Sequence, residues 1–247
     1  DYQNSYGQGS DFNIAGSNGS WGAPFEDGMT IPMYAAIASE YPELALELYP
    51  DLAGNVPYKA YPNNVKDLFK KGHVFDLSAN VQKVTDEGNF NMTLSRTDQD
   101  SYIPGSEFDR YSFSVGGNQK FGKRFRAGGN LAYSYTDQFS PMYGNNQSQA
   151  SNGGMNSLAR AFIMPRSWDI QNYPYQKKDG SNLLFQLSSQ ANNPYWAWEN
   201  DKFQTIQRRI VANANFSFEF TKWLTLDYTL GVNEYMFQRK TIVNLGS

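Results

Sequence analysis

The stretch from Ile210 to Val232 reads IVANANFSFEFTKWLTLDYTLGV and decides the fold of this chain. Apolar residues hold the even positions as far as Phe220, while Asn, Ser and Glu hold most of the odd positions. After a short turn around Lys222, Leu, Tyr and Val alternate with Thr, Asp and Gly. This period of two predicts a hairpin of two long strands with one apolar face.

The same pattern occurs twice upstream in the chain. Residues 75–81 alternate in this way, and residues 90–94 resume the pattern after a turn containing Asp and Gly. Residues 111–115 and 125–136 form the third pair. We therefore predict six strands arranged in three hairpins.

The connections between the hairpins are much longer than the turns within them. Residues 97–109 form a 13-residue link, and residues 137–206 form a 70-residue loop rich in Asn, Gly, Ser and Gln. Long structureless loops are uncommon in compact soluble domains, whereas outer-membrane barrels combine short turns on one side with long loops on the other. Strands at 125–136, 207–220 and 223–234 have the roughly 10 residues that cross a bilayer when tilted. The predicted class is all-β, part of a large antiparallel transmembrane β-barrel with long extracellular loops.

The N-terminal part has a different pattern from the rest of the chain. Short helical pieces are expected within residues 35–48, and Asn64 is placed to cap a short helix that ends before Gly72. We therefore divide the chain into an extracellular loop region with short helices at 1–72 and a β-barrel segment at 73–247.

Composition excludes several function classes. A net charge of −3 with 18% charged residues argues against nucleic-acid binding, which needs clustered Lys and Arg. The absence of Cys and the single His exclude disulfides, Cys-based zinc sites and thiol catalysis. No apolar run approaches the roughly 18 to 20 residues of a membrane-spanning helix. We therefore expect no enzyme activity, no cofactor and no metal ion.

Aromatic residues in the 70-residue loop are the candidate contact residues. Flat rings on an outer loop stack on sugar rings or dock a partner protein, and the alternative is that they pack the loop against itself. The candidates for contact with substrate or with a lid protein are Trp168, Tyr173, Tyr195, Trp196 and Trp198.

Other polar and aromatic residues are given structural roles. Asp98, Asp100, Glu107 and Asp109 are expected to form a solvated acidic loop, with a Ca²⁺ site as the alternative. His73 is expected at the start of a strand without a partner. Four further aromatic residues are expected in the girdle at a membrane interface: Tyr133, Tyr135, Trp223 and Tyr228.

Six short motifs in this order and spacing resemble the SusC/RagA-type TonB-dependent transporters of Bacteroidota outer membranes. They are QNSYGQG at 3–9, SWGAPFEDG at 20–28, NVKDLFKKG at 64–72, MPR at 164–166, NPYW at 193–196 and FTKWL at 220–224. The resemblance implies import of a large nutrient, a glycan or a peptide, across the outer membrane. It also implies two partners, a SusD-type surface lipoprotein as lid and TonB acting on a plug.

The resemblance implies a full-length protein with a barrel of about 22 strands that is filled by an N-terminal plug. This sequence contains neither a plug nor a TonB box, so we expect an internal barrel segment. Ser5 and residues 23–26 depart from the commonest family pattern, which leaves the substrate open. Two other functions also remain open: a secreted carbohydrate-binding β-sandwich, and a transporter relative that serves adhesion or export.

Overall fold

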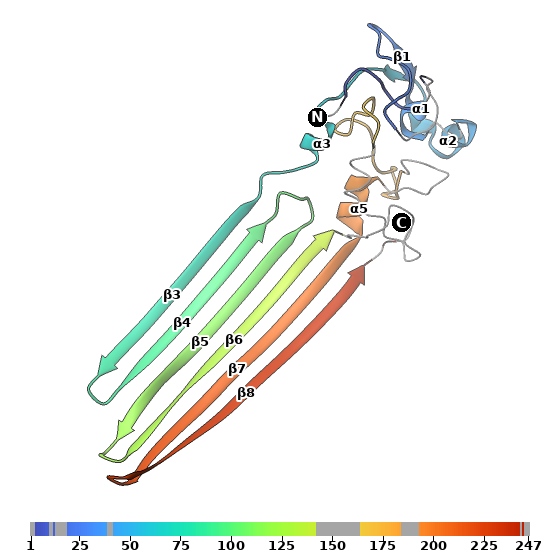
Figure 1. Cartoon of the computed structure of the whole chain (residues 1–247). Coiled ribbons are helices and arrows are strands. Elements are labelled where there is room, and N and C mark those ends of the chain that lie inside the picture. The colour runs from blue at the N-terminus through green and yellow to red at the C-terminus, as the bar shows by residue number, and fades with distance from the viewer. Residues whose placement is uncertain are drawn as a thin grey trace.

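A computed structural model describes residues 3–9, 12, 19–38, 42–141, 164–183, 193–242 and 244. It consists of one long six-stranded antiparallel sheet with a loop-rich region at one end (Figure 1). The strands follow one another in chain order as a meander: β3 (His73–Thr85), β4 (Gly88–Asp100), β5 (Glu107–Phe121), β6 (Phe125–Pro141), β7 (Lys202–Thr221) and β8 (Leu224–Ile242).

The loop-rich region, which we call the loop module, contains the described residues before His73 together with 164–183 and 193–200. Its elements are short: β1 (Thr30–Pro32), α1 (Met33–Ala38), α2 (Pro42–Leu48), the 3-10 helix η1 (Pro50–Leu52), β2 (Asn55–Pro57), α3 (Asn64–Asp67) and α5 (Pro194–Asn200). Among the described residues, no helix is both long enough and apolar enough to cross a membrane.

The all-β class and the three hairpins are confirmed, but the extent of the connections differs from expectation. The predicted length of the link at 97–109, 13 residues, is wrong. Strand β4 runs to Asp100 and β5 starts at Glu107, which leaves residues 101–106 as the connection. At the same end of the sheet, β6 continues to Pro141 and β7 begins at Lys202. Strand pairing thus continues past the point where apolar alternation stops, because backbone hydrogen bonds do not require an apolar face.

The helix at residue 64 begins differently from expectation. Asn63 is the N-cap of α3, and its side chain makes no capping hydrogen bond. Asn64 lies inside the helix, is buried, and donates its side-chain amide to the backbone carbonyl of Trp168. The predicted capping role of Asn64 is therefore wrong: this side chain joins α3 to the loop after β6.

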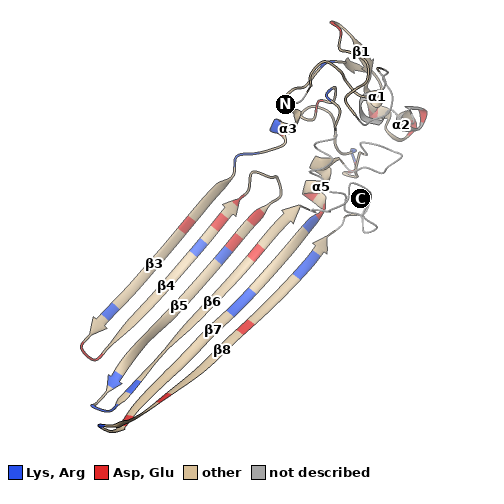
Figure 2. Ribbon diagram, in the orientation of Figure 1, with Lys and Arg blue, Asp and Glu red and all other residues tan. Residues whose placement is uncertain are grey.

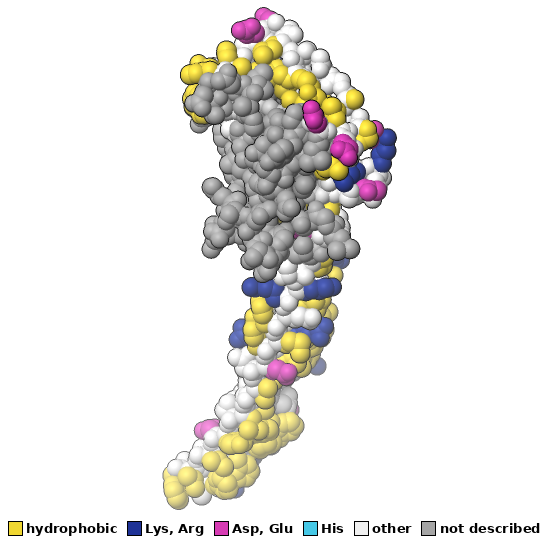
Figure 3. Space-filling model, turned by 90° about the vertical axis from the view of Figure 1, so that its right-hand side faces the viewer, with side chains coloured by type: hydrophobic (Ala, Val, Ile, Leu, Met, Phe, Trp, Pro, Cys, Tyr) yellow, Lys and Arg dark blue, Asp and Glu magenta, His cyan; other side chains and the backbone are white. Residues whose placement is uncertain are grey.

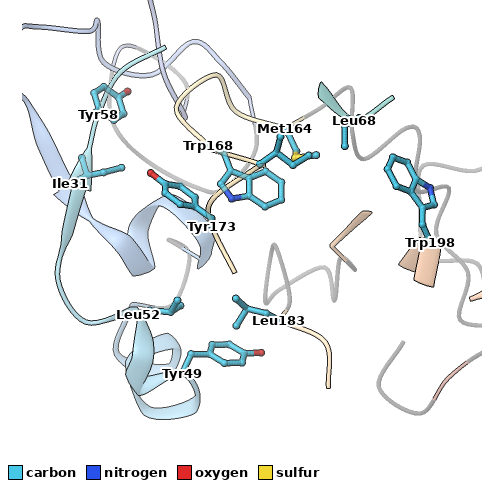
Figure 4. Close-up of a cluster of buried hydrophobic side chains, with 11 residues drawn as sticks. Ile31, Tyr49, Leu52, Tyr58, Leu68, Met164, Trp168, Tyr173, Leu183 and Trp198 are labelled. Carbon is cyan, nitrogen blue, oxygen red and sulfur yellow. The ribbon is translucent and has the colours of Figure 1, made fainter. Parts of the chain in front are cut away.

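The core of the described structure lies in the loop module, not in the sheet (Figure 4). N-terminal residues such as Leu52 and Tyr58 pack with Trp168 and Leu183 from the loop after β6 and with Trp198 from α5. Segments about 100 residues apart thus bury their apolar side chains together. The sheet leaves large apolar side chains exposed, because no second layer of the described residues covers it.

The loop module is attached near both edges of the sheet, beside β3 and beside β8. Next to β3, the Lys70 backbone amide donates to the Tyr102 carbonyl at 2.9 Å. A Cβ on Gly72 would lie 2.6 Å from the Asp100 carbonyl oxygen, so glycine permits this close approach. Beyond β8, the backbone amide of Asn244 donates to Asp201 at 3.1 Å, directly after α5.

Candidate functional site

The two faces of the sheet differ sharply in composition. Register pairs Phe113 with Leu94 and Tyr133, and Leu131 with Val115 and Ala212, so that apolar residues of neighbouring strands share one face. The opposite face carries mainly Asn, Ser, Thr, Gln and Gly. We call these the apolar face and the polar face.

A band without charged residues crosses all six strands (Figure 2). Charged residues lie near the hairpin turns and again in the half of the sheet nearest the loop module. Viewed from the side, hydrophobic side chains gather over the end of the sheet with the turns, and Lys and Arg lie above them (Figure 3). The charge-free band comprises residues 77–82 of β3, 88–95 of β4, 111–119 of β5, 127–136 of β6, 210–218 of β7 and 228–233 of β8.

Tyrosine and arginine mark the upper margin of this band on the apolar face. Arg96 lies over the Tyr111 ring at 5.5 Å, and Arg208 lies over the Tyr135 ring at 5.7 Å. Register places these four residues in one row across β4 to β7. An apolar ring beside a cation suits a boundary between apolar and aqueous surroundings.

The other residues expected in a girdle lie at two levels. Tyr133 is one row below the Tyr135 row, inside the band. Trp223 is 82% exposed in the turn between β7 and β8, at the opposite end of the sheet. Tyr228 faces Phe216 near that end. The girdle itself stays a prediction.

Above the tyrosine row, the apolar face becomes acidic. Asp98 lies directly opposite Asp109, and Asp100 opposite Glu107, so the cluster lies in strands and not in a loop as expected. Like charges in direct opposition destabilise a strand pair. Arg96 offsets part of this repulsion, since its guanidinium is 2.9 Å from Asp98 and 3.9 Å from Asp109.

The lone histidine belongs to the same cluster. Its Nε2 atom lies 3.7 Å from Asp98 and its Nδ1 atom 3.4 Å from Asp100, so the expectation that His73 has no partner is wrong. Lys70 also contacts Asp100, at 3.4 Å. No group of three or more potential ligand residues in the described part of the chain is placed to hold a metal ion.

The polar face carries a different set of charges in its upper half. Arg110 of β5, Arg209 of β7 and Arg239 of β8 are all exposed there. On this face and at these levels, Asp76 of β3 is the one acidic residue among the described strands. None of the three arginines forms an ion pair with a carboxylate of the described residues. This half of the polar face is therefore cationic in a chain of net charge −3.

Serine and aromatic side chains surround these arginines. A hollow of about 310 Å³ is lined by Thr93, Ser95, Ser112, Ser114, Ser134 and Arg209, among others. Its hydroxyls lie in rows across β4, β5 and β6, and the serine row continues through Arg209 to Tyr235 of β8. The Tyr235 and Phe237 rings stack at 6.3 Å with 23° between their planes.

Four of the five aromatic residues proposed as contacts are buried in the loop module. Trp168, Tyr173, Trp196 and Trp198 are between 0% and 7% exposed. Tyr195 is half-buried, and its hydroxyl accepts a hydrogen bond from the Gln171 side chain at 2.9 Å. In this structure the four buried rings pack the module, which was the alternative interpretation, and contact with substrate or lid stays a prediction.

Burial also changes the ionisation of tyrosines in the loop module. It raises the pKa of Tyr58 to about 12, and the Tyr58 hydroxyl donates to the Ala23 carbonyl at 3.0 Å. Burial likewise raises the pKa of Tyr173, with smaller contributions from Tyr61 and Asp169. Both hydroxyls thus remain neutral well above physiological pH.

A second hollow, of about 510 Å³, opens between residues 48–52 and 174–183 of the loop module. Leu52 and Leu183 contribute apolar surface, and Lys178 pairs with Asp51 at 2.9 Å on the rim. Both partners are mostly exposed, so water screens this ion pair strongly.

Sequence reasoning missed the arginines and stacked rings of the polar face. The predicted strand stopped at residue 234, before Tyr235, Phe237 and Arg239. The signal was present, because these three residues continue the odd positions that hold Thr, Asp and Asn earlier in β8.

No model of a known protein family matches this chain, and no curated protein matches it significantly. The function is therefore inferred from the residues and their geometry.

Proposed function

We propose that this chain forms part of the wall and outer loops of an outer-membrane β-barrel that imports a large nutrient, a glycan or a peptide. The transporter would be of the SusC/RagA type, driven by TonB acting on a plug and covered by a SusD-type surface lipoprotein. The observation that carries this proposal is the charge-free band on long antiparallel strands whose apolar face is exposed.

The height of the apolar face on β6 agrees with a bilayer; this face begins at Phe125, one row nearer the turn than the charge-free band. On β6 the apolar face runs from Phe125 to Tyr135, ten residue steps, which is about 33 Å along the strand at about 3.3 Å per residue. A strand tilt of about 45° reduces this to a height of about 23 Å, and the apolar band of outer-membrane barrels is about 25 Å tall. The tyrosine row then lies at one interface.

The remaining parts of the fold suit the same role. The hairpin turns are short, whereas the loop module lies beyond the opposite end of the sheet, as outer loops do in such barrels. The unpaired edges of β3 and β8 would join the further strands that closure of a barrel requires. Asn, Ser and Thr on the polar face suit a water-filled interior.

Single-cysteine scanning tests this proposal, since the chain contains no natural Cys that would interfere. Leu131→Cys and Tyr133→Cys sample the apolar face in the band, and the matched controls Ala132→Cys and Ser134→Cys sample the polar face. Each variant is labelled with bimane, a polarity-sensitive dye, in purified outer membranes. We expect blue-shifted emission at 131 and 133 and water-like emission at 132 and 134.

Two results would contradict the proposal. One is the same emission at all four positions. The other is recovery of the protein in a salt-washed soluble fraction without detergent, which would favour a secreted carbohydrate-binding protein.

A further inference from the structure

The upper half of the polar face combines three features that point to one kind of ligand. Arg110, Arg209 and Arg239 supply guanidinium groups that form no ion pair with a carboxylate of the described residues, although Arg209 Nε donates to Asn233 Oδ1 at 3.3 Å. Guanidinium groups bind carboxylates through two parallel hydrogen bonds. Tyr235 and Phe237 supply two flat, nearly parallel rings that are 57% and 44% exposed. We call these five residues the arginine patch.

Register brings the five residues of the arginine patch into three successive rows. Tyr235 lies directly opposite Arg209, and Phe237 lies on the level of Arg110 through Thr136 and Gln207. Arg239 is the next residue on this face, and its guanidinium stacks on the Phe237 ring at 5.3 Å. The aromatic surface therefore has a cation beside each of its rings.

The spacing of the arginines favours a ligand with several acidic groups. Arg110 and Arg209 are two strands and one row apart, which places their Cα atoms about 12 Å from each other. Arg209 and Arg239 are one strand and two rows apart, or about 14 Å. A single small acid reaches one of these groups at a time, whereas a chain with repeated carboxylates reaches all three.

The surroundings favour a sugar chain over a peptide. The hollow beside Arg209 is lined by hydroxyl groups of Ser95, Ser112 and Ser134, which complement the hydroxyl groups of a sugar. An extended peptide gains affinity by pairing with a free strand edge, but β5, β6 and β7 are paired on both sides. The outer edge of β8 is free in the described sheet, and in the proposed barrel it pairs with a further strand. Exposed aromatic faces add a stacking surface for the apolar side of a sugar ring.

We propose that the arginine patch binds an acidic oligosaccharide, a sugar chain with repeated carboxylate groups. This inference rests on the proposed function, in which the polar face lines a water-filled passage, and it narrows the nutrient to an anionic glycan. The carboxylates bind the three arginines, and the sugar rings stack on Tyr235 and Phe237. The cationic field of this half of the face attracts the ligand.

The test is calorimetric titration of the detergent-solubilised protein with three probes of similar length. These are an oligogalacturonate, a neutral galactan oligosaccharide and an oligoglutamate peptide. We expect the oligogalacturonate to bind at least about 10-fold more tightly than either of the other two, with an affinity that falls as salt is raised.

The chain offers matched control variants for two of the three arginines, Arg209 and Arg239. Arg209→Gln and Arg239→Gln remove charges from the polar face, whereas Arg208→Gln and Lys240→Gln remove charges from the adjacent residues on the apolar face. We expect each polar-face variant to weaken oligogalacturonate binding about 10-fold, and each control to change it less than about 2-fold. Tyr235→Ala should weaken it about 5-fold. Circular dichroism checks that every variant is folded.

Several results would overturn the inference. They are equal binding of the neutral oligosaccharide, equal or tighter binding of the peptide, equal losses in Arg208→Gln and Arg209→Gln, or no binding of the oligogalacturonate. Failure of the transporter proposal is recognised separately, by bimane emission. Oligogalacturonate binding by a protein that fails the bimane test would retain the site and reject the membrane location.

Discussion

A single arginine at the centre of the charge-free band gives a direct measure of what covers the apolar face. Leu131 is six residues from Phe125 and four from Tyr135 on β6. At about 3.3 Å per residue and a tilt of about 45°, it lies about 14 Å from Phe125 and about 9 Å from Tyr135, the two ends of the apolar face on β6. Leu131→Arg therefore places a charge deep in the band.

The expected cost of Leu131→Arg is about 2–4 kcal/mol in the free energy of unfolding, the range for Arg near the middle of a bilayer on the lipid face of a barrel. Two controls separate depth and face. Phe121→Arg lies at the turn end of β5, where the cost falls to about 0–1 kcal/mol. Asn130→Arg lies at the same depth on the polar face, where water solvates the charge, and should cost less than about 0.5 kcal/mol.

The assay is guanidinium unfolding of the protein in lipid vesicles, followed by tryptophan fluorescence. The reasoning is refuted if Leu131→Arg is as stable as the unsubstituted protein. Equal destabilisation by Asn130→Arg would also refute it, because the two faces would then share one environment.

Three further predictions concern the loop module. Leu52 is 1% exposed in the core of the loop module, so Leu52→Ala should destabilise the module by about 2–5 kcal/mol. In hydrogen exchange, the sheet should keep its protection while the module loses it. Equal loss of protection in the module and the sheet would contradict a separate core. Asn64→Ala removes the donor to the Trp168 carbonyl and should cost about 1–3 kcal/mol, seen as faster proteolysis of the module, with exposed Asn63→Ala as the control. Tyr58 has a pKa raised from 10 to about 12, so its contribution to stability is complete below pH 10 and is lost as pH rises to about 12. Thermal unfolding across that range should show a loss that Tyr58→Phe reduces, and an unchanged loss would exclude Tyr58 as its source.

The sheet was predictable where one face must be apolar. Alternation between Ile210 and Val232 placed β7, β8 and their turn, because a one-residue slip would move every apolar side chain to the wrong face. Beyond the band the signal ends: Asp98 and Asp100 occupy the apolar face, although β4 continues to pair there. A charged strand end lacks apolar alternation and cannot be distinguished from a loop in the sequence. The length of the link at 97–109 was therefore overestimated.

The loop module was less predictable, because its core joins segments that share no local pattern. Nothing near Trp168 in the sequence indicates that its carbonyl accepts from Asn64. Both Asn63 and Asn64 are suitable cap residues, and tertiary contacts decide which one enters the helix. The arginine patch was missed for a related reason, because strand pairing across β5, β7 and β8 assembles it.

The joint core of the loop module has a consequence for the order of folding. Each strand of the sheet pairs with its sequence neighbours, so hairpins close with short loops and form early. The module instead needs Tyr61 to meet Arg166 and Asn64 to meet Trp168, across roughly 100 intervening residues. Its first segment is synthesised before β3, yet it must wait for β6 and the following loop. We therefore expect the N-terminal residues to stay exposed until β6 and the following loop have formed, and closure of the module to follow the pairing of these strands.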